Sequence, residues 1–227
     1  MSTDFPKDSF KMFREYKHLA KEFYSGRMFV AFDTETTGLH KDSDFLIEVG
    51  AVKFNCNGLV GEKFSALIKP PVPILELTTQ ITGITNEMVS SAPEASLVLQ
   101  EFLRYINSNT TMLVAHNAPF DLGFLNDQLY RMNFQPIKNL CIDTLPLARW
   151  AYPDFGKEEI RGQYKLQSLA KRFEIDPGSA HRACDDARVC MELFLKCLKD
   201  SMPSQKDYEI HSEPGNLSSQ ESQLELF

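Results

Sequence analysis

The chain has 227 residues, 43% of them hydrophobic, which is enough for one well-buried domain, and no apolar run is long enough to span a membrane. The charged N-terminus lacks the apolar segment of a secretory signal, and the five cysteines form no C-x-x-C pair, so we expect a cytoplasmic protein with reduced thiols. The net charge of −7 counts against a general nucleic-acid binder, but residues 200–227 hold six acids and one base, which leaves −2 for residues 1–199.

The first elements are predicted from the spacing of apolar side chains. Residues 9–24 carry them at helical spacing and predict an amphipathic helix. Strands are predicted at 28–35, 45–55 and 61–68, with a hairpin turn at Asn57-Gly58 between the last two.

The second part of the chain alternates helices and strands. Helices are predicted at 93–108 and 120–132, on either side of a short strand at 112–115. A further strand or helix begins within 140–152. The last helices are predicted at 166–173 and 183–199. Three strands followed by alternating elements indicate a mixed central sheet with helices packed on it.

Three regions are predicted from these elements. Residues 1–26 form an N-terminal helical extension, 27–199 a folded domain, and 200–227 a flexible acidic tail, because that stretch is too polar to bury a core. The N-terminal helix could pack on the domain, or it could dock a partner through Phe13, Tyr16 and Phe23.

Two carboxylates follow the buried strand at 28–35. Asp33 and Glu35 are two residues apart, so on a strand they point to the same face, about 6–7 Å apart along the chain. Like charges at this separation repel unless a cation lies between them. The alternative is a pair of exposed acids at a strand end.

Two further stretches place carboxylates near helix starts. HNAPFD ends at Asp121, and HRACDD contains His181, Asp185 and Asp186. The alternative roles are helix capping by Asp121 or Asn117 and favourable charge at a helix N-terminus. Five helical residues turn through about 500°, so His181 can cooperate with Asp186 only from the loop before the helix.

Together these residues indicate a metal-dependent hydrolase. Oxygen ligands without cysteine or paired histidine favour Mg²⁺ or Mn²⁺ over zinc. Two such ions roughly 3.5–4 Å apart serve phosphodiester hydrolysis, and a neutral histidine can take the proton of the attacking water. The candidate residues are Asp33, Glu35, Asp121, Asp186 and His181.

The three stretches resemble the exonuclease motifs of the DEDD superfamily. They are Asp33-Thr-Glu35-Thr-Thr-Gly, His116-Asn-Ala-Pro-Phe-Asp121 and His181-Arg-Ala-x-x-Asp186. The spacing of the third motif marks the DEDDh (DnaQ-like) branch, whose best-known member is the epsilon proofreading subunit of bacterial DNA polymerase III. The resemblance covers roughly residues 27–198 and includes the stretches 81–93, 141–149 and 164–175.

The resemblance implies an α/β protein with an RNase H-like fold, two divalent ions and 3′→5′ exonuclease activity. By position, Asp33, Glu35, Asp121 and Asp186 would be metal ligands and His181 the general base, whereas Asp185 matches no ligand. The residues that match those gripping the 3′-terminal nucleotide are Thr36, Leu39, Ile81, Thr82 and Phe120.

The substrate remains open at this level. The motifs favour a DNA exonuclease of proofreading or repair, but RNA-trimming relatives carry the same motifs, and the sequence does not show what faces a 2′-hydroxyl. A non-catalytic binding module on this fold is the third hypothesis, although all five catalytic positions are filled.

The tail ends in an apolar cluster. Gln223-Leu224-Glu225-Leu226-Phe227 resembles the pentapeptide with which bacterial polymerases and repair proteins bind the β sliding clamp. That resemblance implies a polar site for Gln223 and an apolar pocket for Leu226 and Phe227. Residues 201–222 would then tether the enzyme to a clamp, near a DNA polymerase.

Overall fold

The computed structural model describes residues 10–158, 160–179 and 181–201, and the predicted tail with its clamp motif therefore lies outside the described residues. The described strands form one seven-stranded sheet. They are β1 (Lys11–Met12), β2 (Phe29–Thr36), β3 (Leu46–Asn55), β4 (Gly58–Leu59), β5 (Phe64–Leu67), β6 (Met112–Ala115) and β7 (Leu140–Asp143).

The sheet is mixed, as predicted. Its order is β1-β7-β6-β2-β3-β4, and β5 pairs with the other half of β3. β2, β6, β7 and β1 are parallel, whereas β3 runs antiparallel to β2. The carboxyl ends of β2, β6 and β7 consequently meet at one edge of the sheet, where polar side chains can converge.

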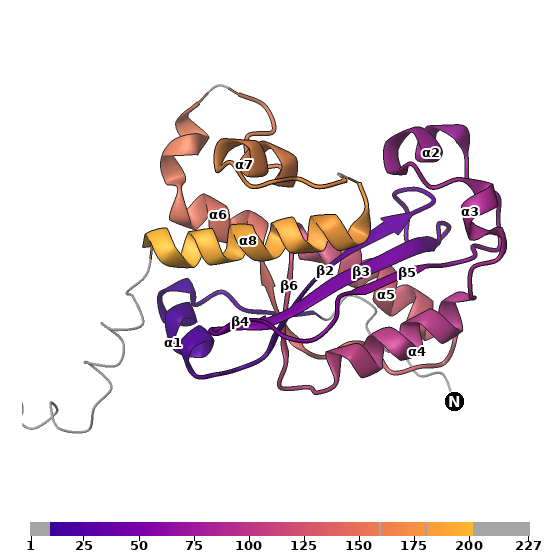
Figure 1. Cartoon of the computed structure of the whole chain (residues 1–227), viewed down its shortest axis with the longest axis horizontal. Helices are drawn as coiled ribbons and strands as arrows, with labels where there is room; N and C mark the ends of the chain where they lie inside the picture. The colour runs from indigo at the N-terminus through magenta and orange to yellow at the C-terminus, as the bar shows by residue number, and fades with distance from the viewer. Residues whose placement is uncertain (1–9, 159, 180, 202–227) are drawn as a thin grey trace, which may run out of the picture.

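Helices cover both faces of the sheet. In Figure 1, α8 crosses one face with α6 and α7 beside it, and α4 and α5 cover the other. The helices are α1 (Leu19–Tyr24), α2 (Glu76–Thr82), α3 (Asn86–Ser90), α4 (Ala95–Ile106), α5 (Ala118–Arg131), α6 (Thr144–Ala151), α7 (Leu166–Arg172) and α8 (Ala183–Ser201). Short 3₁₀ helices precede α1 and α7, namely η1 (Tyr16–His18) and η2 (Pro153–Lys157).

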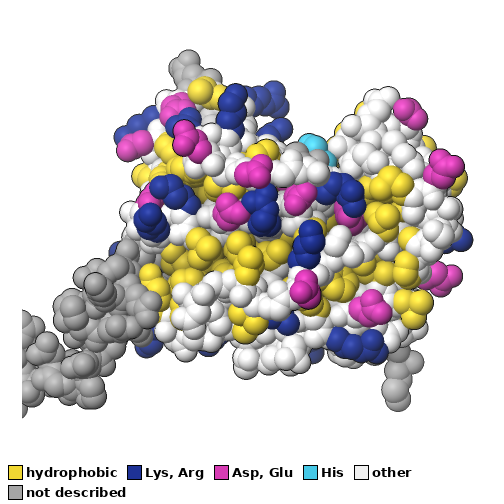
Figure 2. Space-filling model, viewed as in Figure 1, with side chains coloured by type: hydrophobic (Ala, Val, Ile, Leu, Met, Phe, Trp, Pro, Cys, Tyr) yellow, Lys and Arg dark blue, Asp and Glu magenta, His cyan; other side chains and the backbone are white. Residues whose placement is uncertain are grey.

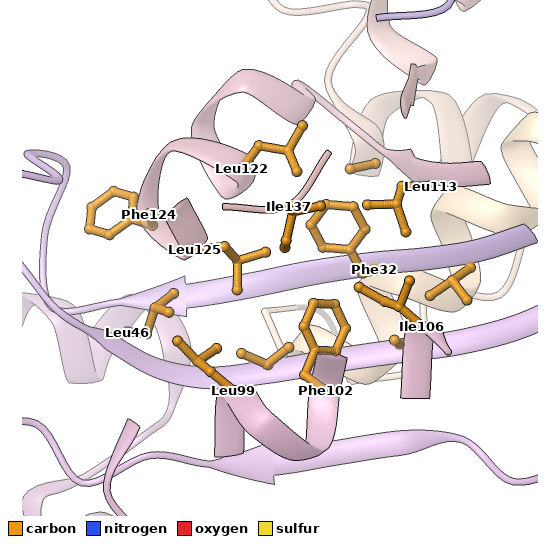
Figure 3. Packing of buried hydrophobic residues seen from close by; sticks show 14 of the residues in the cluster. Phe32, Leu46, Leu99, Phe102, Ile106, Leu113, Leu122, Phe124, Leu125 and Ile137 are labelled. Carbon is orange, nitrogen blue, oxygen red and sulfur yellow. The ribbon is translucent and has the colours of Figure 1, made fainter. Parts of the chain in front are cut away.

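The apolar half of β2 is buried on both faces. Val30 and Phe32 lie in the cluster beneath α4 and α5, where Phe32 contacts Phe102 (Figure 3). Phe29 and Ala31 point the other way, into the cluster that contains Phe194 of α8. This alternation fixes the side chains that follow, because successive residues of a strand point to opposite faces.

The helix predicted at residues 9–24 is wrong in its first part. Lys11–Met12 is a strand rather than helix, since it pairs with the open edge of β7, and the Phe13 amide donates to the Cys141 carbonyl at 2.8 Å. Helical structure begins only at Tyr16. Phe23 is 6% exposed and packs in the core, so it is not free to dock a partner.

Two further details differ from the prediction. The turn after β3 is centred on Cys56-Asn57, one residue early, and Gly58 already belongs to β4. α2 and α3 were not predicted, because the prolines at 70–73 interrupt the pattern before them.

Among the described residues, no helix is both long and apolar enough to cross a membrane.

Candidate active site

Asp33 and Glu35 lie where β2 extends beyond β6. The pairing of these two strands ends at Ala31 with Val114, so the rest of β2 is open on that side. Both carboxylates occupy the face that α8 covers, as their spacing predicts. They therefore border the start of α8.

Asp121 reaches the same place from the opposite face. It is buried near the start of α5, and its Oδ1 accepts hydrogen bonds from the Thr34 amide at 3.0 Å and the Thr34 hydroxyl at 2.7 Å. Thr34 lies between Asp33 and Glu35 in β2. Asp121 is thus bound to the strand, and the Asn117 side chain does not cap the helix.

The third motif adopts the geometry that cooperation requires. His181 is exposed in the turn before α8, at φ +63°, and its amide donates to Asp186 Oδ2 at 3.0 Å. Ligand atoms of Glu35, His181 and Asp186 all lie within 4.8 Å of one another. Asp185 instead accepts from the Ser179 amide at 2.9 Å and supports the preceding loop.

The start of α8 is held by Glu48, a residue that sequence reasoning missed. This carboxylate of β3 is 1% exposed and accepts from the Arg182 guanidinium, with Nη2–Oε1 at 2.8 Å, and from the Ala183 amide at 3.0 Å. An acid inside the apolar run 46–52 was the available signal. Gly50 lies opposite Asp33, and a Cβ there would come 2.1 Å from the Cys184 nitrogen.

All five predicted catalytic side chains line one cavity of about 440 Å³. Its walls also include residues that were not predicted, notably Thr34, Gln167 and Lys165. Gln167 donates to Asp186 Oδ1 at 2.5 Å, which fixes that carboxylate from α7. Figure 2 shows the surface hollowed between the part that contains α2 and α3 and the part that contains η2 and α7.

The acids of the cavity favour protonation when no cation is bound. Burial raises the pKa of Glu35 to about 8, and nearby Asp186 and Glu48 add to the effect. Burial also raises the pKa of Asp121 to about 7, against the hydrogen bonds from Thr34. The pKa of Asp33 lies well above its usual range, through burial and the neighbouring Asp121. A divalent cation would relieve these repulsions.

His116 lines the same cavity but is not suited to proton transfer. Its Nε2 donates to the Tyr164 carbonyl at 3.0 Å, so its Nδ1 accepts from the Thr144 hydroxyl at 2.9 Å. Burial lowers its pKa to about 4, which keeps the ring neutral. Of the two histidines in the cavity, His181 is the one with an exposed ring.

The predicted substrate residues divide into two groups. Phe120 lines the cavity, and Leu39 and Ile81 are 78% and 53% exposed, so they can meet a ligand. Thr36 is buried, and its hydroxyl donates to the Gly38 carbonyl.

Thr82, which the resemblance places at the terminal nucleotide, is buried at the end of α2. Its side chain is 5% exposed, and its hydroxyl donates to the Thr78 carbonyl and accepts from the Ile84 amide. These bonds close the last turn of α2, which ends at Gly83, so the hydroxyl is already committed.

Comparisons with known proteins point in one direction. The family model described as an exonuclease, RNase_T, matches residues 30–194. DNA polymerase III subunit epsilon of Treponema pallidum (strain Nichols) is 45% identical over 166 residues, which cover 73% of this chain and 74% of that protein. DNA polymerase III PolC-type of Bacillus subtilis (strain 168) is 38% identical over 186 residues, or 82% of this chain.

A solved structure agrees with the fold. E. coli exonuclease I in complex with a dT13 oligonucleotide superposes with a TM-score of 0.67 at 20% identity, over 82% of this chain. The chain spans only 12% of the PolC polypeptide and 43% of exonuclease I. The likeness therefore concerns one domain of each of these larger proteins.

Proposed function

The chain belongs to the RNase T-type family of exonucleases, the DEDDh 3′→5′ exonucleases that its motifs predict, and from this premise we propose that it removes nucleotides from DNA 3′ ends with divalent metal ions. One observation carries the proposal. Five side chains from three distant stretches line a single cavity, namely Asp33, Glu35, Asp121, His181 and Asp186.

The carboxylates suit Mg²⁺ or Mn²⁺. The donor set is made of hard oxygen atoms beside one imidazole. Burial raises the pKa values of Glu35 and Asp121, and a bound cation would favour their ionised form. Asp33, Glu35, Asp121 and Asp186 would hold the metal, as two ions. Bound ions would stabilise the negative charge that develops on the phosphate during hydrolysis.

The other roles fall to side chains that the structure orients. His181 takes a proton from the attacking water, since its ring is exposed at the cavity and His116 is fully hydrogen-bonded. Gln167 and Thr34 hold the carboxylates of Asp186 and Asp121 in place. Leu39, Ile81 and Phe120 offer apolar surface to the terminal base, and Thr36 and Thr82 support it through their hydrogen bonds to the backbone.

We propose DNA rather than RNA as the substrate because the relatives belong to DNA polymerase III. The protein at 45% identity is a subunit of DNA polymerase III, and the PolC-type relatives carry that polymerase name too. We assign this chain to proofreading or repair beside a DNA polymerase in the cytoplasm. Gln223, Leu224, Leu226 and Phe227 would bind the β sliding clamp, a contact that lies outside the described residues.

The test uses end-labelled single strands of DNA and RNA of equal length. With Mg²⁺ or Mn²⁺, a 5′-labelled DNA should shorten stepwise from its 3′ end, and chelation should stop the reaction. Closed circular single-stranded DNA should resist, because it has no 3′ end. Faster trimming of RNA would make the chain an exoribonuclease, and binding without cleavage would make it a non-catalytic module.

A further inference from the structure

A second cavity adjoins the catalytic one. It encloses about 530 Å³ between the start of α5, α6 and the loop before α7. His116, Lys165 and Leu166 line both cavities. The two spaces are therefore neighbouring parts of one trough, which extends from the carboxylates toward α6.

The second cavity carries positive charge. Arg149 and Lys165 line it and are exposed, and neither side chain forms an ion pair within the described residues. Two other cations near this loop are paired, Arg172 with Glu158 and Lys157 with Asp154. Free guanidinium and ammonium groups beside an apolar wall are typical of contacts to a phosphate backbone.

The wall of this cavity is held in place before any ligand binds. The His116 ring joins the start of α5 to the loop through the Tyr164 carbonyl at 3.0 Å, and the Tyr164 hydroxyl donates to the Tyr152 carbonyl at 2.7 Å. The Arg149 guanidinium lies 5.6 Å from the centre of the Tyr164 ring. Leu145 and Leu166 complete an apolar surface on which a base can rest.

The position of the cavity gives the direction of the strand. The residues expected at the terminal nucleotide, Leu39 and Ile81, belong to the β2–α2 side of the carboxylates. The second cavity lies on the α6–α7 side, and Figure 1 shows α2 and α7 on opposite sides of the start of α8. The second cavity is thus placed to receive a strand whose last nucleotide occupies the first side.

We propose that the second cavity binds the nucleotides immediately 5′ of the scissile phosphate in a single DNA strand, with Arg149 and Lys165 pairing with backbone phosphates beside Tyr164. This inference rests on the proposed exonuclease function and adds a second binding site to it. It makes affinity depend on strand length.

The test compares substrates that do and do not reach the cavity. The p-nitrophenyl ester of thymidine 5′-monophosphate has no phosphate other than the one that is cleaved, whereas a longer oligonucleotide adds backbone phosphates that can reach Arg149 and Lys165. In Arg149→Gln, the ratio of kcat/KM for the oligonucleotide to that for the ester should fall about fivefold to tenfold, mainly through KM. In the double variant that also carries Lys165→Gln, this ratio should fall further.

Salt dependence gives a second measurement. Each cation removed should reduce the slope of log KM for the oligonucleotide against log salt by about 0.7. Lys171→Gln is the matched control, because Lys171 is an exposed cation of α7 outside both cavities. It should keep the wild-type ratio and slope.

The outcomes separate the two proposals. If Arg149→Gln and the double variant keep the wild-type ratio and slope, the second site is wrong and the exonuclease proposal stands. An equal loss with ester and oligonucleotide would also overturn the second site, because the cations would then act on the catalytic centre. Failure of the wild-type protein to cleave either substrate would overturn the proposed function itself.

Discussion

Single side chains decide the geometry of the proposed catalytic site, and Glu48 is the clearest case. It lies opposite Glu35 in the pairing of β2 with β3, and its carboxylate fixes both the Arg182 side chain and the Ala183 amide. His181 and Asp186 lie on either side of those two residues. Glu48 is therefore a positioning residue for the third motif.

Glu48→Gln should destabilise the chain and impair turnover. The amide preserves the shape but leaves the Arg182 charge without a partner in a partly buried place, which should cost about 2 kcal/mol of unfolding free energy. Urea unfolding measures this loss, and kcat should fall more than KM rises.

The control for that variant is Glu192→Gln. Glu192 accepts from Arg188 of α8, but its side chain is 36% exposed, whereas that of Glu48 is 1% exposed. Its loss should cost less than about 1 kcal/mol and leave kcat near wild type. Equal effects of the two variants would remove the positioning role from Glu48.

Two neighbouring carboxylates should differ in their importance for chemistry. Asp186→Asn weakens a predicted metal ligand, and turnover should fall roughly thousandfold or more. Asp185→Asn changes a residue that accepts a hydrogen bond from the Ser179 amide, and it should lower turnover less than about tenfold. Steady-state kinetics on a single-stranded oligonucleotide tests both. Comparable inactivation by the two variants would show that the third motif is misaligned.

The sequence predicted the acidic residues of the site but not the residues that hold them in place by hydrogen bonds. Asp33, Glu35, Asp121 and Asp186 follow apolar runs or open helices, which is a local pattern. Gln167 and Glu48 become relevant only through partners far along the chain, 19 and 134 residues away. The buried state of Thr82 likewise depends on how α2 ends, which spacing does not reveal.

Among the elements, β3 and α8 approach each other unusually closely. The backbone at Ala183 and Cys184 occupies the space where a side chain at Gly50 would project. This contact sets the height of α8 above β2 and therefore the distance between the third motif and the carboxylates of the first.

Gly50→Ala should disturb both stability and activity. The added Cβ would lie 2.1 Å from the Cys184 nitrogen and 2.2 Å from the Ala183 carbonyl carbon, so the start of α8 must move. We expect a loss of about 3 kcal/mol in unfolding free energy together with a large fall in kcat.

Gly123→Ala provides the comparison. Gly123 is buried in α5, and a Cβ there would meet only the flexible Lys41 side chain at 3.4 Å. Its effect should stay within about 1 kcal/mol. Wild-type turnover in Gly50→Ala would show that the height of α8 does not control the site.

Element prediction succeeded where periodicity was long and failed where pairing was remote. β2, β3, α4, α5 and α8 were located within about two residues, since each has a sustained apolar pattern. Lys11–Met12 is a strand because it pairs with the open edge of β7. The spacing of side chains within residues 9–24 cannot reveal this distant partner. The expected RNase H-like fold is confirmed by the mixed sheet and the superposition on exonuclease I.

For the whole molecule, the buried acids couple stability to pH. In the absence of metal, the pKa values of Glu35 and Asp121 are about 8 and about 7 in the folded chain, against about 4 when unfolded. The folded chain therefore retains protons that the unfolded chain gives up. Their stabilisation is complete below about pH 4 and is lost as pH rises through about 7 to 8.

Metal-free protein should consequently be less resistant to urea at pH 9 than at pH 6. Mg²⁺ should stabilise it most at the higher pH, where the carboxylates are ionised and repel one another. Glu35→Gln should reduce the dependence on pH. A Mg²⁺ effect of the same size at both pH values would contradict the assignment of these acids as ligands.

The residues of the proposed catalytic site come from two parts of the chain, which the loop between η2 and α7 separates. Asp33, Glu35 and Asp121 precede that loop, whereas His181 and Asp186 follow it. α8 also supplies Phe194 to the core against β2, so the second part has an apolar surface with which to rebind the first. Cut at this loop, the chain would become a two-fragment reporter. Neither piece carries a full set of acids, and nuclease activity would reveal their reassociation when each was fused to one member of an interacting pair.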